Sequence, residues 1–168
     1  MTANKSLQTG ASASAALQCQ TNPPQRILVV DDDADIRRLN FEVLTESGYQ
    51  VDAAKDGAAA WQALNSSNYD LLITDINMPI VTGLELVKKL RSEDMMLPVI
   101  LMSGTLPTEE LELHPWLQIQ ATLLKPYTLA ELFKTVKEVL GATRGASGPD
   151  APPANWQCLS PAVNRLQA

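Results

Sequence analysis

The sequence predicts an α/β domain built around a parallel sheet. Short apolar runs alternate with segments of helical periodicity five times along the chain, and parallel strands need such helical crossovers between them. The apolar runs are mostly continuous, as expected for strands whose two faces are both covered by helices. Hydrophobic residues make up 45% of the 168 residues, which is enough for one buried core.

The first predicted elements are a buried strand and a helix. The run ILVV (27–30) predicts the strand because it is short, apolar and rich in β-branched residues. Ile36, Leu39 and Val43 follow at helical spacing and predict the helix. Gly48 is predicted to end this helix, since glycine is common just after helix C-termini.

The next elements are a strand, a helix and a second buried strand. The alternating segment YQVDAA (49–54) predicts an edge strand. The segment GAAAWQAL (57–64) predicts a helix that follows Asp56. The apolar run YDLLITD (69–75) predicts a strand in the interior of the sheet.

Two capping boxes mark the starts of later helices. Thr82 and Glu85 form one pair, and Thr128 and Glu131 form the other, each ahead of apolar residues at helical spacing. In such a pair the two side chains satisfy each other's free backbone N–H groups. Gly141 is predicted to end the last helix.

Two further strands complete the predicted sheet. The run LPVILMS (97–103) predicts a third buried strand, and ATLL (121–124) predicts a short final one. Between them, the segment from Pro107 to Gln118 is the least regular part of the domain and contains Pro115.

Composition divides the chain into one domain and two flanks. Residues 1–25 and 143–168 have the composition of linkers, so the domain is predicted to span residues 26–142. No run approaches the about 20 apolar residues of a membrane span, and the start of the chain lacks the apolar core of a secretory signal. We therefore expect a cytoplasmic protein in which Cys19 and Cys158 are free thiols.

The charge balance argues against nucleic-acid binding. The net charge is −6 and the pI is about 4.7, so the chain has no basic footprint for a phosphate backbone. Neither a GxxxxGK[ST] nor a GxGxxG loop is present, which argues against a nucleotide site.

Polar side chains stand where four predicted strands end. Asp31 and Asp32 follow the first strand, Asp75 ends the third, Ser103 the fourth, and Lys125 follows the fifth. Because parallel strands end at one edge of the sheet, we expect these side chains to converge there. A turn or a helix cap explains each residue alone, but their shared location favours a site.

Such a set of side chains predicts a magnesium-dependent phosphoryl site. Clustered carboxylates repel one another unless a cation compensates them, and oxygen ligands suit Mg²⁺. A lysine and a hydroxyl group nearby can bind phosphoryl oxygens. A carboxylate can itself accept the phosphoryl group as an aspartyl phosphate.

Four segments of the chain resemble the signature segments of response-regulator receiver domains. They are ILVVDDDADIRRL, LLITDINMPIVTGLEL, PVILMSGT and LLKPY, and the resemblance covers about residues 26–141. It implies a doubly wound, five-stranded parallel sheet in strand order 2-1-3-4-5, with helices on both faces. It also implies a chemotaxis-regulator-like signalling domain of a two-component system.

The resemblance implies a role for each acidic position. Asp75 resembles the phosphate acceptor, and Asp31 and Asp32 resemble the acidic pair that holds Mg²⁺. Asn77 resembles the residue whose backbone carbonyl completes the metal site, to which Asp75 also contributes. Asp33 matches no ligand position and is interpreted as a turn or N-cap residue.

The resemblance also covers the later strand ends, with one departure. Ser103 resembles the switch hydroxyl, Lys125 resembles the lysine that pairs with the phosphoryl group, and Pro126 resembles a proline that often follows a cis peptide bond. The family usually has an aromatic residue where this chain has Thr122, so whether an aromatic side chain takes part in switching stays open. Tyr127 is aromatic but lies after the proline.

The function implied by the resemblance is that of a stand-alone response regulator. A histidine kinase or a histidine phosphotransfer protein would phosphorylate Asp75, and phosphorylation would change protein–protein contacts. The chain would then be no enzyme beyond catalysing its own phosphorylation and slow dephosphorylation. The downstream protein is not indicated, and pairing of two copies through the face from strand four to helix five stays open. We expect neither a membrane nor a nucleic-acid partner.

Two alternatives remain open from the sequence. The first is a haloacid-dehalogenase-like phosphatase, because Asp31 and Asp33 have the spacing of its DxD nucleophile motif. That interpretation leaves Asp75 without a role, and no acidic pair follows Lys125. The second is a receiver-shaped binding module that is never phosphorylated.

Overall fold

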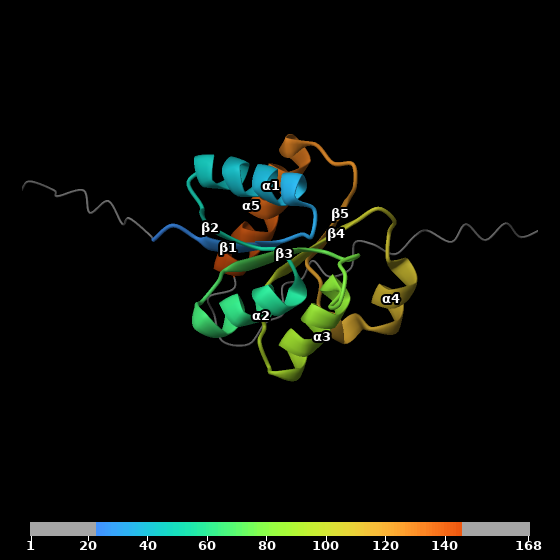
Figure 1. Ribbon diagram of the computed structural model, residues 1–168. Helices are drawn as coiled ribbons and strands as arrows, with labels where there is room; N and C mark the ends of the chain where they lie inside the picture. The colour runs from blue at the N-terminus through green and yellow to red at the C-terminus, as the bar shows by residue number, and fades with distance from the viewer. Residues whose placement is uncertain (1–22, 146–168) are drawn as a thin grey trace, which may run out of the picture.

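The computed structural model describes residues 23–145 as a five-stranded parallel sheet with helices on both faces (Figure 1). The strand order is β2-β1-β3-β4-β5, which confirms the predicted topology and places the first alternating segment at an edge. The strands are β1 (Arg26–Val30), β2 (Gln50–Ala54), β3 (Leu71–Asp75), β4 (Val99–Ser103) and β5 (Ala121–Leu124).

The helices form two layers. They are α1 (Ala34–Glu46), α2 (Gly57–Ser66), α3 (Gly83–Ser92), α4 (Thr108–Leu113), the 3-10 turn η1 (Pro115–Leu117) and α5 (Leu129–Gly145). α1 and α5 cover one face of the sheet, and α2, α3 and α4 lie on the other (Figure 1). In the part of the chain that the structure describes, no helix is both long and apolar enough to cross a membrane.

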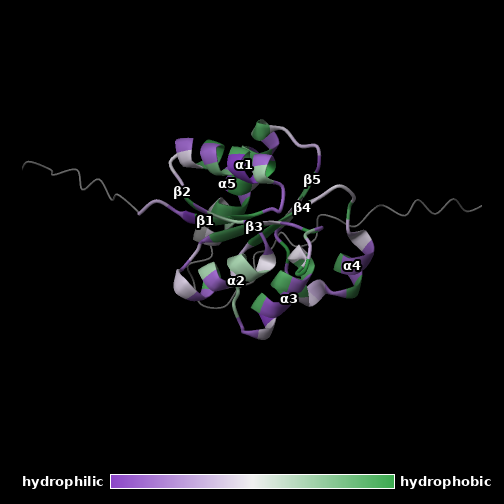
Figure 2. Ribbon diagram, viewed as in Figure 1, coloured by the Kyte–Doolittle hydropathy of each residue, from purple (hydrophilic) through white to green (hydrophobic). Residues whose placement is uncertain are grey.

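The sheet separates two apolar cores. Leu28 and Val30 of β1 point into the core beneath α2 and α3, whereas Ile27 and Val29 point into the core beneath α1 and α5. Every residue of β3 and β4 is buried, and the strands are the most apolar part of the ribbon in Figure 2. Each fully buried Leu or Ile stabilises the fold by roughly 1.5–3 kcal/mol.

Both predicted capping boxes are present. The Thr82 hydroxyl accepts a hydrogen bond from the Glu85 N–H (3.2 Å), and the Glu85 carboxylate accepts one from the Thr82 N–H (2.9 Å). Thr128 and Glu131 form the same reciprocal pair ahead of α5. The hydrogen bonds from the backbone and side chain of each threonine lower the pKa of Glu85 and of Glu131. Two helix starts were thus correctly located from the sequence.

The structure corrects three local predictions. Gly141 does not end the last helix, because α5 continues to Gly145 and the Thr143 hydroxyl bonds to the carbonyl of Leu140 within it. The irregular segment before β5 contains the short helix α4 and the turn η1. The buried stripe of α1 also differs from the predicted one, as described below.

In α1 the buried face is shifted from the predicted apolar residues. The fully buried side chains of this helix are Asn40 and Leu44, while Leu39 is 47% exposed. A polar residue on the core-facing side is therefore the main departure of α1 from an ordinary amphipathic pattern. Predictions that concern residues 1–22 and 146–168, including the two cysteines, lie outside the described residues.

Candidate functional site

The carboxyl ends of four strands bring the predicted polar residues to one edge of the sheet. Asp31 directly follows β1, Asp75 is the last residue of β3, and Ser103 is the last residue of β4. Lys125 follows β5, and its backbone N–H donates to the carbonyl of Ser103 (2.7 Å). In register, Asp75 lies opposite Met102, the residue before Ser103. The predicted convergence of these strand ends is observed.

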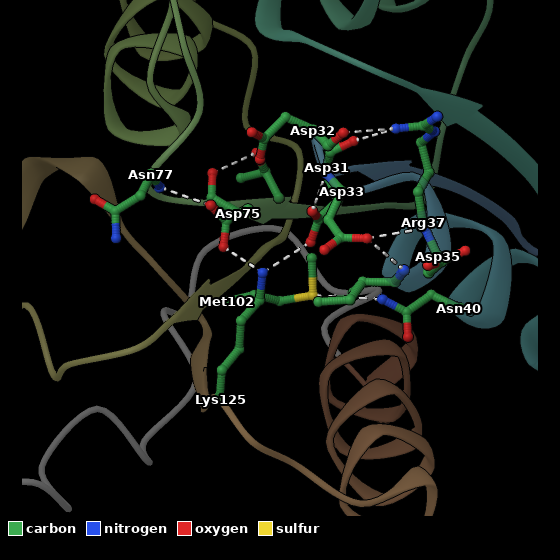
Figure 3. A network of polar contacts seen from close by, with 12 residues as sticks. Asp31, Asp32, Asp33, Asp35, Arg37, Asn40, Asp75, Asn77, Met102 and Lys125 are labelled. Atoms are coloured by element: carbon green, nitrogen blue, oxygen red, sulfur yellow. Dashed lines mark hydrogen bonds and ion pairs between the residues drawn. The ribbon is translucent and has the colours of Figure 1, made fainter.

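One lysine lies between two buried carboxylates (Figure 3). Lys125 Nζ is 2.6 Å from Asp75 Oδ1 and 2.9 Å from Asp31 Oδ2. Asp31 is fully buried and Asp75 is 4% exposed, whereas the Lys125 side chain is 23% exposed and reaches the site from the rim. One ammonium therefore faces two largely desolvated carboxylates.

The charges perturb each other's protonation. Burial raises the pKa of Asp31 above its ordinary value, and the hydrogen bonds from Lys125 and from the Asp33 N–H only partly oppose this. Burial alone would lower the pKa of Lys125, but its bonds to Asp75 and Asp31 outweigh that effect and raise it. Lys125 thus stays an ammonium at neutral pH. Its single positive charge faces two carboxylates and cannot balance both.

The backbone after β3 fixes the orientation of Asp75. Its Oδ2 accepts a hydrogen bond from the Asn77 N–H (2.8 Å), and the Ile76 N–H donates to the carbonyl of Met102 (2.9 Å). Gly83, the first residue of α3, donates to the carbonyl of Ile76 (3.1 Å) and packs directly on the backbone of Asp75. A Cβ at position 83 would collide with the Asp75 carbonyl oxygen, so the close approach requires glycine there.

The turn between β1 and α1 presents the acidic pair. Asp31 Oδ1 accepts from the Asp33 N–H (2.9 Å), and Asp33 caps α1 by accepting from two N–H groups of its first turn. The prediction of an N-cap role for Asp33 is confirmed. Asp32 is exposed at the rim. The Arg37 guanidinium donates to the carbonyls of Asp31 (2.7 Å) and Asp32 (3.3 Å), a support that the sequence did not reveal.

Two predicted residues, Ser103 and Asn77, lie at the same edge of the sheet. Ser103 is 2% exposed, and its hydroxyl accepts from the Thr105 N–H (3.2 Å). Asn77 contributes its backbone N–H, while its side chain is exposed. Among residues 23–145, no hydrogen bond joins the Ser103 hydroxyl or the side-chain amide of Asn77 to Asp75. The peptide bond from Lys125 to Pro126 is cis, as the resemblance implied.

The donor set suits a hard divalent cation. Carboxylate oxygens of Asp31, Asp32 and Asp75 are the ligand type that Mg²⁺ takes, and the unbalanced charge of the buried pair favours a cation. Within the described residues, no group of three or more His, Cys, Asp or Glu side chains is placed to hold a metal ion by itself. Mg²⁺ does not need one, because it keeps several waters and accepts backbone carbonyls.

Asn40, Tyr127 and Met102 form a second polar cluster on the α1 side of the sheet. Figure 3 shows two of its members, Asn40 and Met102, near the carboxylates. Asn40 Nδ2 donates to the Tyr127 hydroxyl (2.8 Å) and lies 3.6 Å from Met102 Sδ. The Tyr127 hydroxyl is 3.1 Å from the same sulfur. Burial raises the pKa of Tyr127, so the hydroxyl keeps its proton. The sequence offered no signal for this cluster beyond one polar residue within a helix.

Comparison with known proteins assigns the family. The model of the response regulator receiver domain matches residues 27–137, which is more than half of the chain. The chain belongs to this receiver-domain family. Receiver domains are signalling domains of two-component systems and are not enzymes in the ordinary sense.

Known relatives and structures agree with this assignment. The chain is 33% identical over 129 residues to the response regulator MprA of Mycobacterium sp. (strain KMS), covering 77% of this chain and 56% of that protein. The chemotaxis response regulator CheY4 of Vibrio cholerae matches with a TM-score of 0.64 at 30% identity, covering 69% of this chain and 98% of that one. The chain therefore spans about half the length of the curated relatives it matches, such as MprA.

A third similar protein was solved with ligands. The response regulator TrrA of Thermotoga maritima, in a structure described as a complex with Mg(2+)-BeF, has a TM-score of 0.61 at 36% identity. The match covers 68% of this chain and 98% of that one. Receiver domains generally bind Mg²⁺, and the donor set described above fits that ion.

Proposed function

We propose that Asp75 accepts a phosphoryl group from a histidine kinase or a histidine phosphotransfer protein. The observation that carries this proposal is the placement of Asp75. Its carboxylate is held at the end of β3, with one oxygen on Lys125 and the other on the Asn77 N–H, and with Asp31 alongside. A carboxylate so oriented and desolvated is arranged to attack a phosphorus atom.

The transfer forms one bond and breaks another. An oxygen of Asp75 forms the bond to phosphorus, while the bond from phosphorus to the imidazole nitrogen of the donor breaks and its electron pair stays with that nitrogen. Lys125 then pairs with a phosphoryl oxygen, since its ammonium already lies against Asp75. The Ser103 hydroxyl at the end of β4 is the proposed donor to a second phosphoryl oxygen.

A bound Mg²⁺ supplies charge neutralisation for the phosphoryl oxygens. The proposed ligands are the carboxylates of Asp31, Asp32 and Asp75 and the backbone carbonyl of Asn77. Arg37 supports this set from α1 by holding the backbone carbonyls of the acidic pair.

The proposed consequence of phosphorylation is a change of protein contacts. Lys125 and Ser103 lie at the ends of β5 and β4, so their movement toward a phosphoryl group would shift the adjoining face. The remaining parts of the proposal are a cytoplasmic regulator acting alone, slow self-dephosphorylation, and pairing of two copies through the face from β4 to α5.

The two alternatives fare differently. The phosphatase interpretation loses its basis because Asp33 caps α1 and the chain belongs to the receiver family. A receiver-shaped module that is never phosphorylated has the same fold as a functional receiver. A phosphorylation assay separates it from the present proposal.

The test is incubation with acetyl phosphate in the presence and absence of Mg²⁺, read as intact mass. The wild type is expected to gain one phosphoryl group only with Mg²⁺, and Asp75→Asn none. Asp94→Asn is the matched control, because Asp94 is an exposed residue beyond α3 with a positive φ of 56° that asparagine tolerates well. A phosphorylated Asp75→Asn protein would overturn the proposal.

A further inference from the structure

A buried asparagine in α1 has a single strong hydrogen-bond partner. Asn40 is fully buried, and its Nδ2 donates to the Tyr127 hydroxyl at 2.8 Å. Its Oδ1 is buried without a partner among the described residues. Burying an amide with half of its hydrogen-bonding capacity unused costs stability relative to a leucine. The Asn40–Tyr127 hydrogen bond therefore orients these two side chains more than it stabilises the fold.

The pair links three elements of the site. Asn40 lies in α1, whose first residues follow the acidic pair, and Tyr127 lies in the loop that carries Lys125. The Tyr127 hydroxyl also reaches Met102 Sδ (3.1 Å), and Met102 lies opposite Asp75 in the sheet. One hydroxyl thus joins the strand beside the acceptor, the helix behind the metal ligands and the lysine loop.

The loop of Lys125 is held at two points. On one side of the residue, its own N–H donates to the Ser103 carbonyl. On the other side, two residues along, the Tyr127 hydroxyl is anchored to Asn40 and Met102. Without the hydrogen bonds of the Tyr127 hydroxyl, the chain after Lys125 would be held only by the Tyr127 ring, which packs on the core beneath α1 and α5.

We propose that Tyr127 is a positioning residue for the phosphorylation of Asp75, with Asn40 as the group that orients its hydroxyl. The hydroxyl keeps the loop at the place where Lys125 Nζ lies between Asp75 and Asp31. This inference rests on the proposed function of Asp75. Because small misplacements of a charged group reduce the rate of a reaction steeply, loss of the anchor slows transfer without removing any reacting group.

The first experiment deletes the hydroxyl and keeps the ring. For Tyr127→Phe, the rate of phosphorylation by acetyl phosphate at saturating Mg²⁺ is expected to fall about fivefold, the effect of one lost hydrogen bond. Tyr69→Phe is the matched control, since the Tyr69 hydroxyl is also hydrogen-bonded (2.8 Å to Asp52) but lies at the opposite end of the sheet. Its rate is expected to equal that of the wild type.

A double variant separates positioning from stability. In Tyr127→Phe the Asn40 amide loses its acceptor, and this alone destabilises the fold. Combining it with Asn40→Leu removes the unpaired group, so the urea midpoint is expected to recover while phosphorylation stays about fivefold slow. A double variant that is phosphorylated at the wild-type rate would show that the hydroxyl only satisfies Asn40, and it would overturn the inference.

The outcomes also distinguish this inference from the proposed function. Absence of phosphorylation in the wild type would overturn the role of Asp75 and the positioning role with it. A wild type phosphorylated on Asp75, together with a Tyr127→Phe variant of equal rate, would overturn the positioning role alone.

Discussion

At the scale of single residues, the site is defined by an imbalance of buried charge. Lys125 is the one ammonium that contacts Asp31 and Asp75 among the described residues, so the two carboxylates together carry one negative charge that Lys125 does not balance. Desolvation of a carboxylate without full compensation costs stability. The buried carboxylates therefore lower the stability of the fold at the place where a cation and a phosphoryl group are proposed to bind.

This imbalance predicts that Asp31→Asn stabilises the protein. Asparagine keeps the shape of the side chain and removes the charge whose pKa burial raises, while Lys125 keeps its bond to Asp75. In Mg²⁺-free buffer at pH 7, the free energy of unfolding is expected to increase by about 1 kcal/mol. Urea unfolding with and without Mg²⁺ measures it.

The pH dependence of this gain follows from the direction of the shift. The folded-state pKa of Asp31 lies above its ordinary value of 3.8, so ionised Asp31 destabilises the fold only as the pH rises through and above that value. The gain from Asp31→Asn is therefore expected at neutral pH and should disappear below about pH 3.8. Equal or lower stability of the variant at pH 7 without Mg²⁺ would contradict the charge imbalance.

Single residues also show where prediction from sequence ended. The positions of Asp31, Asp75 and Lys125 were predictable because strand ends in a parallel sheet share one edge. The hydrogen bond between Tyr127 and Asn40 could not be predicted, because contacts between residues 87 positions apart depend on how α1 is rotated against the sheet. The apolar spacing of α1 gave a face that includes Leu39, whereas the helix buries Asn40.

At the scale of elements, the packing of α3 on β3 positions the acceptor. The first residue of α3 is Gly83, which touches the backbone of Asp75, and Thr82 caps the helix directly before it. A capped helix start is rigid, so this contact fixes the end of the strand. The capping box was visible in the sequence, but the contact of glycine with strand backbone was not, because it depends on the distance between two elements.

We predict that Gly83→Ala displaces the end of β3. The added methyl group would meet the carbonyl oxygen of Asp75, which is backbone and cannot swing away. A loss of more than about 2 kcal/mol in the free energy of unfolding and a slower phosphorylation of Asp75 are expected.

The control for this prediction is Gly141→Ala in α5. Nothing lies within 4 Å of a Cβ at position 141, and the residue is exposed within a helix. Alanine there is expected to raise the stability by roughly 0.5–1 kcal/mol. A Gly83→Ala protein as stable and as quickly phosphorylated as the wild type would contradict the proposed contact.

At the scale of the whole molecule, the fold was predictable because every signal pointed the same way. Continuous apolar strands, capping boxes and polar strand ends all indicated a parallel sheet with one functional edge, and the observed strand order agrees. The end of α5 was misplaced because glycine is tolerated inside a helix at a cost of about 1 kcal/mol, and α5 continues through Gly141 to Gly145.

The distribution of buried residues predicts that residues 23–145 fold on their own. Among the described residues, the buried members of both apolar cores lie between Ile27 and Leu140. The fragment is expected to have the same free energy of unfolding in urea as the full chain, within about 0.5 kcal/mol, and the same rate of phosphorylation by acetyl phosphate. A fragment that fails to fold cooperatively would show that the flanks contribute to the core.

The most direct test of the central claim is to locate the phosphoryl group on the full chain. After treatment with acetyl phosphate and Mg²⁺, borohydride reduction of an aspartyl phosphate leaves homoserine at the modified position, which peptide mass spectrometry identifies. The predicted result is homoserine at position 75 alone. Homoserine at position 31 or 33, or at none of the aspartates, would contradict the assignment of Asp75 as the phosphate acceptor.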